Sequence, residues 1–532
     1  MTLLIDSLTL PKNHTIETEV CIIGAGAAGI TLAREFANQK FRVCFLESGG
    51  LEFEEDSQSL YEGENIGHSY IPLDLCRLRF FGGSTNHWGG GCWPFDKIDF
   101  EKREWIPYSG WPFDKKHLNS YYKRAQKIIQ LGQYDYSSEA WEDSEKRPKL
   151  PFDAGIVVSK VTQINPLLFG EIYRDEIARA TNIETFLHAN VVDIETDETG
   201  QNIIRLNVTS LESNNFSVSA KVFILCAGGI ENPRLLLLSD KIQKTGLGNE
   251  NDLVGRFFME HLEFWSGVVR FSDPNIITTL YSAHSVNNTL IRAALKISDE
   301  TQRRKKLINA SLYLSSPVEN RSESFINATA SKGYKSLVQI YKHLRKGSWP
   351  DNFAKNLGNM LADIDDVAIA GYKTLFKSKS RTKMYWLENN MEQTPDPESR
   401  VTLSNEQDAL GQRTIQLNWK LSPIQIQNLR RSHEILGQEL GRLGLGRIQI
   451  TLNDESYAWL NRVKGQAHHM GTTRMHVDPK QGVVDENCKV HGLSNLYVAG
   501  SSVFPTSGRT NPTLTIVALA ARLADHIKEI MS

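Results

Sequence analysis

The 532-residue sequence has few cysteines, no excess of charge of either sign and no long apolar run. Its six cysteines are Cys21, Cys44, Cys76, Cys92, Cys226 and Cys488. They form no C-x-x-C pair and no C-x-x-C-H haem motif, which argues against a disulfide framework or a zinc site. The 60 Lys and Arg residues nearly balance the 62 Asp and Glu residues, so the net charge is −2. This balance gives no support for a nucleic-acid-binding surface.

Segments that would direct the chain into or across a membrane are also missing. No apolar run reaches the roughly 18 residues that span a bilayer. The first 20 residues lack a basic start followed by an apolar core, so no signal peptide is predicted. An apolar fraction of 40% is enough to bury large cores and excludes a disordered protein. The composition therefore predicts a soluble, cytoplasmic, globular protein without a transmembrane segment.

Residues 20–47 have the pattern of a strand, a tight turn, a helix and a second strand. Val20–Ile23 is a short apolar run typical of a strand buried on both faces, and Arg42–Leu46 is expected to be the second strand. Between them the turn GAGAAG, Gly24–Gly29, opens an amphipathic helix. Glu47 follows Gly29 by 18 residues, close to the spacing of a ribose-binding carboxylate.

The spacing G-x-G-x-x-G suits a dinucleotide. Gly24 makes the tight turn, Gly26 lets the backbone approach a pyrophosphate, and Gly29 allows close packing of helix on strand. The phosphates then lie at the helix N-terminus, where free N–H groups and the helix dipole favour negative charge. These residues do not decide between FAD and NAD.

Other segments have weaker patterns. Residues 1–18 are expected to form an ordered or frayed lead-in, and Arg79–Trp93 is too rich in glycine and aromatics to be regular throughout. Further expected elements are a helix at Lys115–Leu131, a buried strand at Val218–Ala227, a helix at Asn232–Ser239 and a final helix at Pro512–Ile530. The basic segments Lys332–Lys346 and Lys373–Lys383 are expected to be solvated helix faces, with membrane-surface or partner helices as the alternative.

Two segments near the C-terminus combine histidine, glycine and asparagine. They are AHHMGTTRM at Ala467–Met475, and NLYVAGSSVFP at Asn495–Pro505 running on to TNPTLT at Thr510–Thr515. With these motifs the chain resembles the glucose–methanol–choline (GMC) family of FAD-dependent oxidoreductases. The resemblance also covers GAGAAG, FFGGSTNHW at residues 80–88, AGGIENP at residues 227–233, VGR at residues 254–256 and the pair Glu260-His261. The middle of the chain matches only loosely.

The resemblance implies an α/β fold with two domains, closest to the branch of pyranose oxidase and of the fructose and gluconate dehydrogenases. A Rossmann-like FAD-binding domain would carry an inserted mixed-sheet α+β substrate domain. We expect the FAD-binding domain at residues 16–150, 186–267 and 461–532. We expect the substrate domain at residues 151–185 and 268–460.

The same resemblance implies that the cofactor is FAD. The expected FAD-binding residues are Gly24, Gly26, Ala27, Ala28, Gly29, Glu47, Ser48, Gly82, Gly83, Ser84, Asn86, His87, Val192, Ala227, Gly228, Gly500, Ser501, Asn511 and Thr513. For the adenine contact, Val191 is the alternative to Val192. The spacing G-G-x-x-x-H-W around His87 resembles the pyranose oxidase loop, whose histidine carries a covalent flavin link. A noncovalent position beside the flavin is the other interpretation of His87.

The family motif H-x-x-G-T, aligned on Gly471-Thr472, makes His468 the catalytic histidine, with His469 as a neighbouring support. Asn511 takes the second active-site position. The implied reaction oxidises a primary or secondary alcohol to a carbonyl, with His468 as general base and hydride transfer to flavin N5. Asn511 would donate a hydrogen bond to the substrate oxygen. Asn511 before Pro512 is also typical of a helix N-cap, so a purely structural role stays open.

The favoured substrate is a sugar, polyol or glycoside, and this preference rests on the resemblance alone. Electrons would pass to O₂ or to a separate acceptor, since the chain has no haem motif. A lyase or tailoring enzyme that uses FAD non-oxidatively on a non-sugar metabolite is the alternative, and an NAD-linked dehydrogenase is less favoured. No metal is expected, because Asp363, Asp365 and Asp366 lack the glycine and glutamate of a calcium loop. The sequence leaves homo-oligomerisation open.

Overall fold

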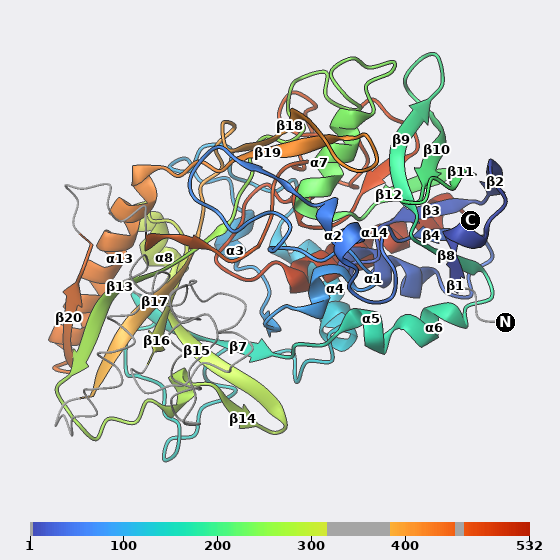
Figure 1. Ribbon diagram of the computed structural model, residues 1–532. Coiled ribbons are helices and arrows are strands. Elements are labelled where there is room, and N and C mark those ends of the chain that lie inside the picture. The colour runs from blue at the N-terminus through green and yellow to red at the C-terminus, as the bar shows by residue number, and fades with distance from the viewer. Residues whose placement is uncertain (1–3, 316–382, 453–461) are drawn as a thin grey trace, which may run out of the picture.

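The computed structural model describes residues 4–315, 383–452 and 462–532 (Figure 1). The basic residues 332–346 and 373–382 and the acidic residues Asp363, Asp365 and Asp366 lie outside these ranges. Within them, none of the helices has the length and apolar character needed to cross a membrane. The same ranges bring together no cluster of three His, Cys, Asp or Glu side chains able to hold a metal ion.

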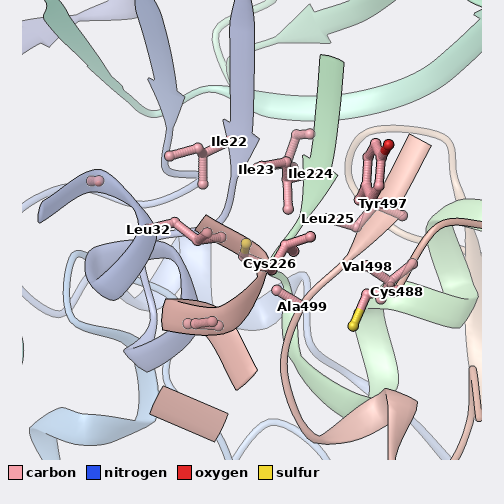
Figure 2. Packing of buried hydrophobic residues seen from close by; sticks show 14 of the residues in the cluster. Ile22, Ile23, Leu32, Ile224, Leu225, Cys226, Cys488, Tyr497, Val498 and Ala499 are labelled. Carbon is pink, nitrogen blue, oxygen red and sulfur yellow. The ribbon is translucent and has the colours of Figure 1, made fainter. Parts of the chain in front are cut away.

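A six-stranded parallel sheet lies on the right in Figure 1, with the strand order β1-β8-β4-β3-β12-β22. Its strands are β1 (Leu4–Asp6), β3 (Val20–Ile23), β4 (Val43–Leu46), β8 (Ile183–Leu187), β12 (Val222–Leu225) and β22 (Leu496–Val498). All residues of β3, β4, β12 and β22 are buried, as expected for short apolar strands covered on both faces. Figure 2 shows the core where β3, β12 and β22 end.

Helices cover this sheet. α1 (Ala27–Phe36) packs against β3 and β4, and α14 (Thr513–Ile530) packs against both α1 and α4 (Lys115–Ile128). α7 (Gly228–Leu238) follows β12 and contacts β9 and β18. The shorter helices are α2 (Glu55–Ser59), α3 (Lys97–Phe100), α5 (Phe169–Ile172), α6 (Arg174–Ala178) and α8 (Asp299–Lys305). The 3₁₀ turns are η1 (Ser7–Thr9), η2 (Gly83–Asn86), η3 (Thr279–Tyr281) and η5 (Ser501–Val503).

Two smaller sheets flank this part. One has the order β2-β11-β10-β9, with β2 (His14–Glu17), β9 (Asn190–Thr196), β10 (Ile203–Thr209) and β11 (Asn215–Ser219). The other has the order β18-β19-β5, with β5 (Gly63–Asn65), β18 (Arg400–Gln407) and β19 (Arg413–Asn418). In the second sheet β19 pairs in parallel with β5, which ties residues near 415 to the segment that follows α2.

The large sheet on the left in Figure 1 has the order β20-β13-β17-β16-β15-β7-β6, with β14 paired to β15 and β21 to β13. Its strands are β6 (Gly91–Cys92), β7 (Val157–Ile164), β13 (His261–Phe271), β14 (His284–Val286), β15 (Thr289–Ile297), β16 (Ala310–Ser315), β17 (Met384–Glu392), β20 (Gly446–Ile450) and β21 (Lys464–Gly465). α13 (Pro423–Arg442) packs against β20 and β15. Ser266 Oγ of β13 lies 2.9 Å from His433 Nε2 of α13, so this helix covers one face of the sheet.

Several expected elements differ from the structure. Of the two alternatives for the lead-in, residues 4–18 follow the ordered one, because β1 and β2 pair with β8 and β11. The expected strand Val218–Ala227 is two strands, since the chain leaves β11 at Ser219 and enters the parallel sheet only at Val222. α7 begins at Gly228, four residues before the predicted start, because the AGG turn itself is its first turn. The N-cap of α14 is Pro512 rather than Asn511, and it has no side-chain cap.

Candidate active site

A cavity of about 870 Å³ lies between the parallel sheet and one face of the large sheet. One side of the cavity is lined by residues at the carboxyl ends of strands of the parallel sheet. These are Ile23, Leu46, Cys226 and Gly500. This is the edge at which open α/β sheets bind ligands. The opposite wall comes from the large sheet, by residues of β6, β7, β13, β15, β16 and β17. The volume is at the upper end of the range of ligand pockets, about 300–1,000 Å³.

Most residues predicted to bind FAD line this cavity. They are Gly24, Gly26, Ala27, Ala28, Glu47, Ser48, Gly83, Ser84, Asn86, His87, Val192, Ala227, Gly228, Gly500, Ser501, Asn511 and Thr513. Val191 lines it too. Gly29 and Gly82 lie behind the lining. A Cβ at Gly29 would sit 1.9 Å from the carbonyl oxygen of Gly24, so this glycine permits close packing of helix on turn.

Three helix N-termini open onto the cavity without a side-chain cap. They belong to α1 at Gly26, α7 at Ala227 and α14 at Pro512. Uncapped first-turn N–H groups and the helix dipole favour an anion, such as a pyrophosphate. A Cβ at Gly26 would meet no atom within 4 Å, so the backbone of α1 faces open space there. The cavity, the glycine turn and these termini fit FAD.

Glu47 braces the glycine turn that would hold the cofactor. Its Oε2 accepts a hydrogen bond of 2.8 Å from Ala25 N–H, and its Oε1 accepts one of 3.0 Å from Gly49 N–H. Gly24 has φ +103°, and a Cβ there would lie 2.8 Å from the carbonyl oxygen of Cys226. The predicted ribose carboxylate therefore has a second role, which is to fix the shape of the turn.

His468 lies at the large-sheet end of the cavity and is held by two neighbours. Its Nδ1 is 2.9 Å from Nδ1 of His261, and its backbone N–H donates to Glu260 Oε1 at 2.9 Å. Burial lowers the pKa of His468 well below its ordinary value, and charge on His261 or His469 would lower it further. Its imidazole is therefore neutral, with a lone pair that can accept a proton.

Glu260 anchors the backbone on both sides of this histidine pair. Besides His468 N–H, its carboxylate accepts hydrogen bonds from His261 N–H and from the Tyr70 hydroxyl. Burial raises the pKa of Glu260 to about 7, while these hydrogen bonds lower it. Because the Glu260 carboxylate accepts hydrogen bonds from several groups, it holds the backbone at His261 and His468 in place and so positions the His468 side chain.

Asn511, the second predicted catalytic residue, lines the same cavity as His468. Asn390 Nδ2 of β17 donates to Asn511 Oδ1 at 3.3 Å. This bond uses one lone pair of the amide oxygen and leaves the two Asn511 Nδ2 hydrogens as donors. The N-cap interpretation of Asn511 is wrong, since Pro512 caps α14.

His469 and His87 also line the cavity. His469 Nε2 lies 3.5 Å from Cys76 Sγ, and its ring packs near Tyr70 and Phe258. Burial lowers the pKa of His469 to about 3. Desolvation beside the cavity also lowers the pKa of His87, although its side chain is partly exposed. Both rings are neutral at pH 7, and His469 is in a supporting position beside the predicted base.

Sequence reasoning missed the wall that faces the glycine turn. Alternate residues of neighbouring strands project polar groups into the cavity: Thr162 (β7), Glu263 (β13), Arg292 (β15), Tyr313 (β16), and Glu388 and Asn390 (β17). Glu388 and Asn390 are two residues apart in β17 and so lie on one face of the sheet, and this spacing is the pattern that could have identified the wall. Without strand pairing, that pattern does not say which residues share the wall.

Buried ion pairs join this wall to the C-terminal loop. Arg509 Nε donates to Asp96 Oδ2 at 2.8 Å, and Asp96 also pairs with Lys296 Nζ of β15 at 2.7 Å. Arg103 makes two hydrogen bonds to Glu392 of β17, at 2.6 and 2.8 Å. Arg509 is two residues before Asn511, so the network positions that amide against β17.

Comparisons with known proteins indicate an FAD-dependent oxidoreductase. A family profile described as FAD dependent oxidoreductase matches residues 19–243, and one described as GMC oxidoreductase matches residues 395–520. Fructose dehydrogenase large subunit from Gluconobacter japonicus is 23% identical over 97% of this chain and 98% of its own. 2-Methyl-1,2-propanediol dehydrogenase from Mycolicibacterium austroafricanum is 23% identical over 97% and 96%. Paromamine 6'-oxidase from Streptomyces fradiae is 22% identical over 96% and 92%.

Solved structures show the same fold. Pyridoxine 4-oxidase from Mesorbium loti superposes with a TM-score of 0.53 at 15% identity, over 96% of this chain and 99% of its own. An R554A variant of Aspergillus oryzae formate oxidase superposes with a TM-score of 0.51 at 16% identity, over 98% and 99%. The fold and cavity thus define an FAD-dependent oxidoreductase with an FAD-binding domain and a mixed-sheet substrate domain. The matched profiles and the full-length relatives together support a GMC-type FAD-dependent oxidoreductase.

Proposed function

We propose that this enzyme oxidises a primary or secondary alcohol to a carbonyl, with His468 as the general base. The observation that carries the proposal is that His468 and Asn511 line the same cavity as the glycine turn of α1. When bound along that turn, FAD supplies the acceptor for the hydride that leaves the alcohol carbon. Three of the relatives have names that state fructose, 2-methyl-1,2-propanediol and paromamine as substrates, which supports hydroxyl-bearing substrates.

In this proposal each protein group has one task. His468 takes the hydroxyl proton, which leaves negative charge on the substrate oxygen. Asn511 Nδ2 donates a hydrogen bond to that oxygen and stabilises the charge. The uncapped N-terminus of α14, two residues beyond Asn511's backbone, favours negative charge in the same part of the cavity.

We further propose a sugar, polyol or glycoside as the substrate. The wall opposite the glycine turn presents polar side chains to the cavity, among them Thr162, Arg292 and Asn390. Together such side chains donate and accept hydrogen bonds, which suits neighbouring hydroxyl groups. Arg292 also lies 3.5 Å from Glu388 and stacks on the Tyr313 ring at 4.5 Å, so its guanidinium is held in place.

We expect sugars and polyols to bleach the oxidised-flavin absorption band faster than simple alcohols of equal carbon number. The physical reason is that only the former pair with Asn390 and Arg292 as well as with His468 and Asn511. The measurement is anaerobic mixing of the yellow holoenzyme with a panel of sugars, polyols, glycosides and alkanols. Bleaching by alkanols alone would contradict the substrate class, and no bleaching by any alcohol would contradict the reaction.

For His87 we expect a noncovalent contact with the flavin, so acid precipitation should give a colourless pellet and a yellow supernatant. The reason is that His87 lines the cavity and its ring is neutral. Such a ring can pack beside the flavin without a covalent bond to it. A yellow pellet from the wild-type chain that becomes colourless in His87→Ala would establish the covalent link instead.

A further inference from the structure

His261 contacts the predicted base from outside the cavity. It is the first residue of β13, it is fully buried, and it is not among the cavity-lining residues. Its Nδ1 lies 2.9 Å from His468 Nδ1. Its Nε2 lies 3.1 and 3.0 Å from the backbone carbonyl oxygens of Ser507 and Gly508, in the loop that leads to Asn511.

These contacts decide where the protons are. Carbonyl oxygens only accept, so Nε2 of His261 must carry a hydrogen and donate it. Burial lowers the pKa of His261 to about 4, so the ring is neutral and its Nδ1 holds a lone pair. Two lone pairs at 2.9 Å would repel, and therefore His468 Nδ1 must be the donor of the shared hydrogen bond. Nε2 of His468 is then unprotonated.

We infer that His261 is a positioning residue that fixes His468 as its Nδ1–H tautomer and so keeps Nε2 free to take the hydroxyl proton. The inference rests on the proposed function, in which His468 is the base. No proton crosses the pair. The hydroxyl proton bonds to His468 Nε2, Nδ1 keeps its own hydrogen, and the lone pair of His261 stabilises the positive charge that His468 then carries.

Two substitutions separate this role from simple support of the loop. In His261→Asn the amide oxygen can replace Nδ1 as the acceptor for His468, while the donor to Ser507 and Gly508 is lost. In His261→Gln the amide nitrogen can replace Nε2 as that donor, while the acceptor is lost. We expect the Asn variant to reduce FAD within about 5-fold of the wild-type rate, and the Gln variant to be about 10- to 100-fold slower.

The measurements are anaerobic single-turnover reduction of the holoenzyme and thermal unfolding of both variants. A purely structural role predicts the reverse order, with Gln faster and more stable than Asn, and that order would overturn the inference. A normal reduction rate in His468→Ala would instead overturn the proposed function. The two failures are therefore distinguishable.

A readout independent of activity is the ¹⁵N spectrum of histidine-labelled holoenzyme. The resonances of His468 are assigned by their loss in His468→Asn. We expect the unprotonated nitrogen of His468 to be Nε2 in the wild type and in His261→Asn, and both tautomers to be populated in His261→Gln. An unprotonated Nδ1 in the wild type would refute the assignment.

Discussion

Replacing His468 with alanine should slow reduction of FAD by alcohol by about 100-fold or more, because general-base catalysis contributes factors of this size. Cofactor binding should persist, since the glycine turn of α1 and its brace Glu47 are separate from this side chain. Stopped-flow absorbance under anaerobic conditions measures the rate, and the visible spectrum of the purified variant measures bound FAD. Near-normal reduction by a yellow variant would show that another group removes the proton.

The pH dependence gives a second test of the same residue. Because burial lowers the pKa of His468 below 6.5, its neutral form persists as the pH falls through that value. The acid limb of kcat/KM for the wild type should therefore lie below pH 6.5. The matched control is His117→Ala. It changes a histidine of α4 that does not line the cavity, and it should leave the acid limb in place.

Replacing Arg103 with leucine should destabilise the protein by about 3–5 kcal/mol. The guanidinium and Glu392 are 0% and 2% exposed and make two parallel hydrogen bonds, so the substitution leaves a carboxylate buried without its cation. Urea unfolding of the holoenzyme, followed by tryptophan fluorescence, should show the midpoint falling accordingly. A midpoint within experimental error of the wild type would contradict the prediction.

Two controls make the result specific to the buried pair. The double variant Arg103→Leu/Glu392→Leu removes both charges and should recover a large part of the loss, since no charge is left unpaired. Arg205→Leu breaks the ion pair between Arg205 of β10 and Glu195 of β9, whose side chains are 50% and 27% exposed. This substitution should barely change the urea midpoint. Equal losses in Arg103→Leu and Arg205→Leu would show that burial is not the cause.

The cofactor half of the site was predictable because each part is local in sequence. Val20–Ile23 is a strand, Gly24–Gly26 forms the turn into α1, and Glu47 follows the next strand, so one segment of 28 residues contains the whole argument. The glycines are required by backbone geometry that only glycine meets, such as φ +103° at Gly24. The pair His468 and Asn511 came from family motifs rather than from physics, and the structure brings both to one cavity.

The other half was not predictable because it depends on pairing between distant strands. Asn390 orients Asn511 across 121 positions, and His261 meets His468 across 207. No sequence pattern around Asn390 or His261 indicates which residue its side chain contacts. The pair Glu260-His261 was visible as a motif, yet its role follows only from distances between ring nitrogens. The N-cap prediction for Asn511 failed for a related reason. Asparagine is favoured both as an N-cap and as a hydrogen-bonding amide in an active site, and the sequence does not distinguish the two roles.

The edge strand β22 and the helix α14 complete the parallel sheet and its cover from residues 496–530, while the glycine turn is made near residue 24. A ribosome must therefore synthesise almost the whole polypeptide before the flavin pocket has all its walls. The riboflavin-derived cofactor can therefore bind only late in the synthesis of this enzyme, and its cellular concentration affects chains that are almost or fully synthesised. Early translation intermediates expose the apolar strands β3 and β4 without their final neighbours, which favours aggregation until β12 and β22 have been made.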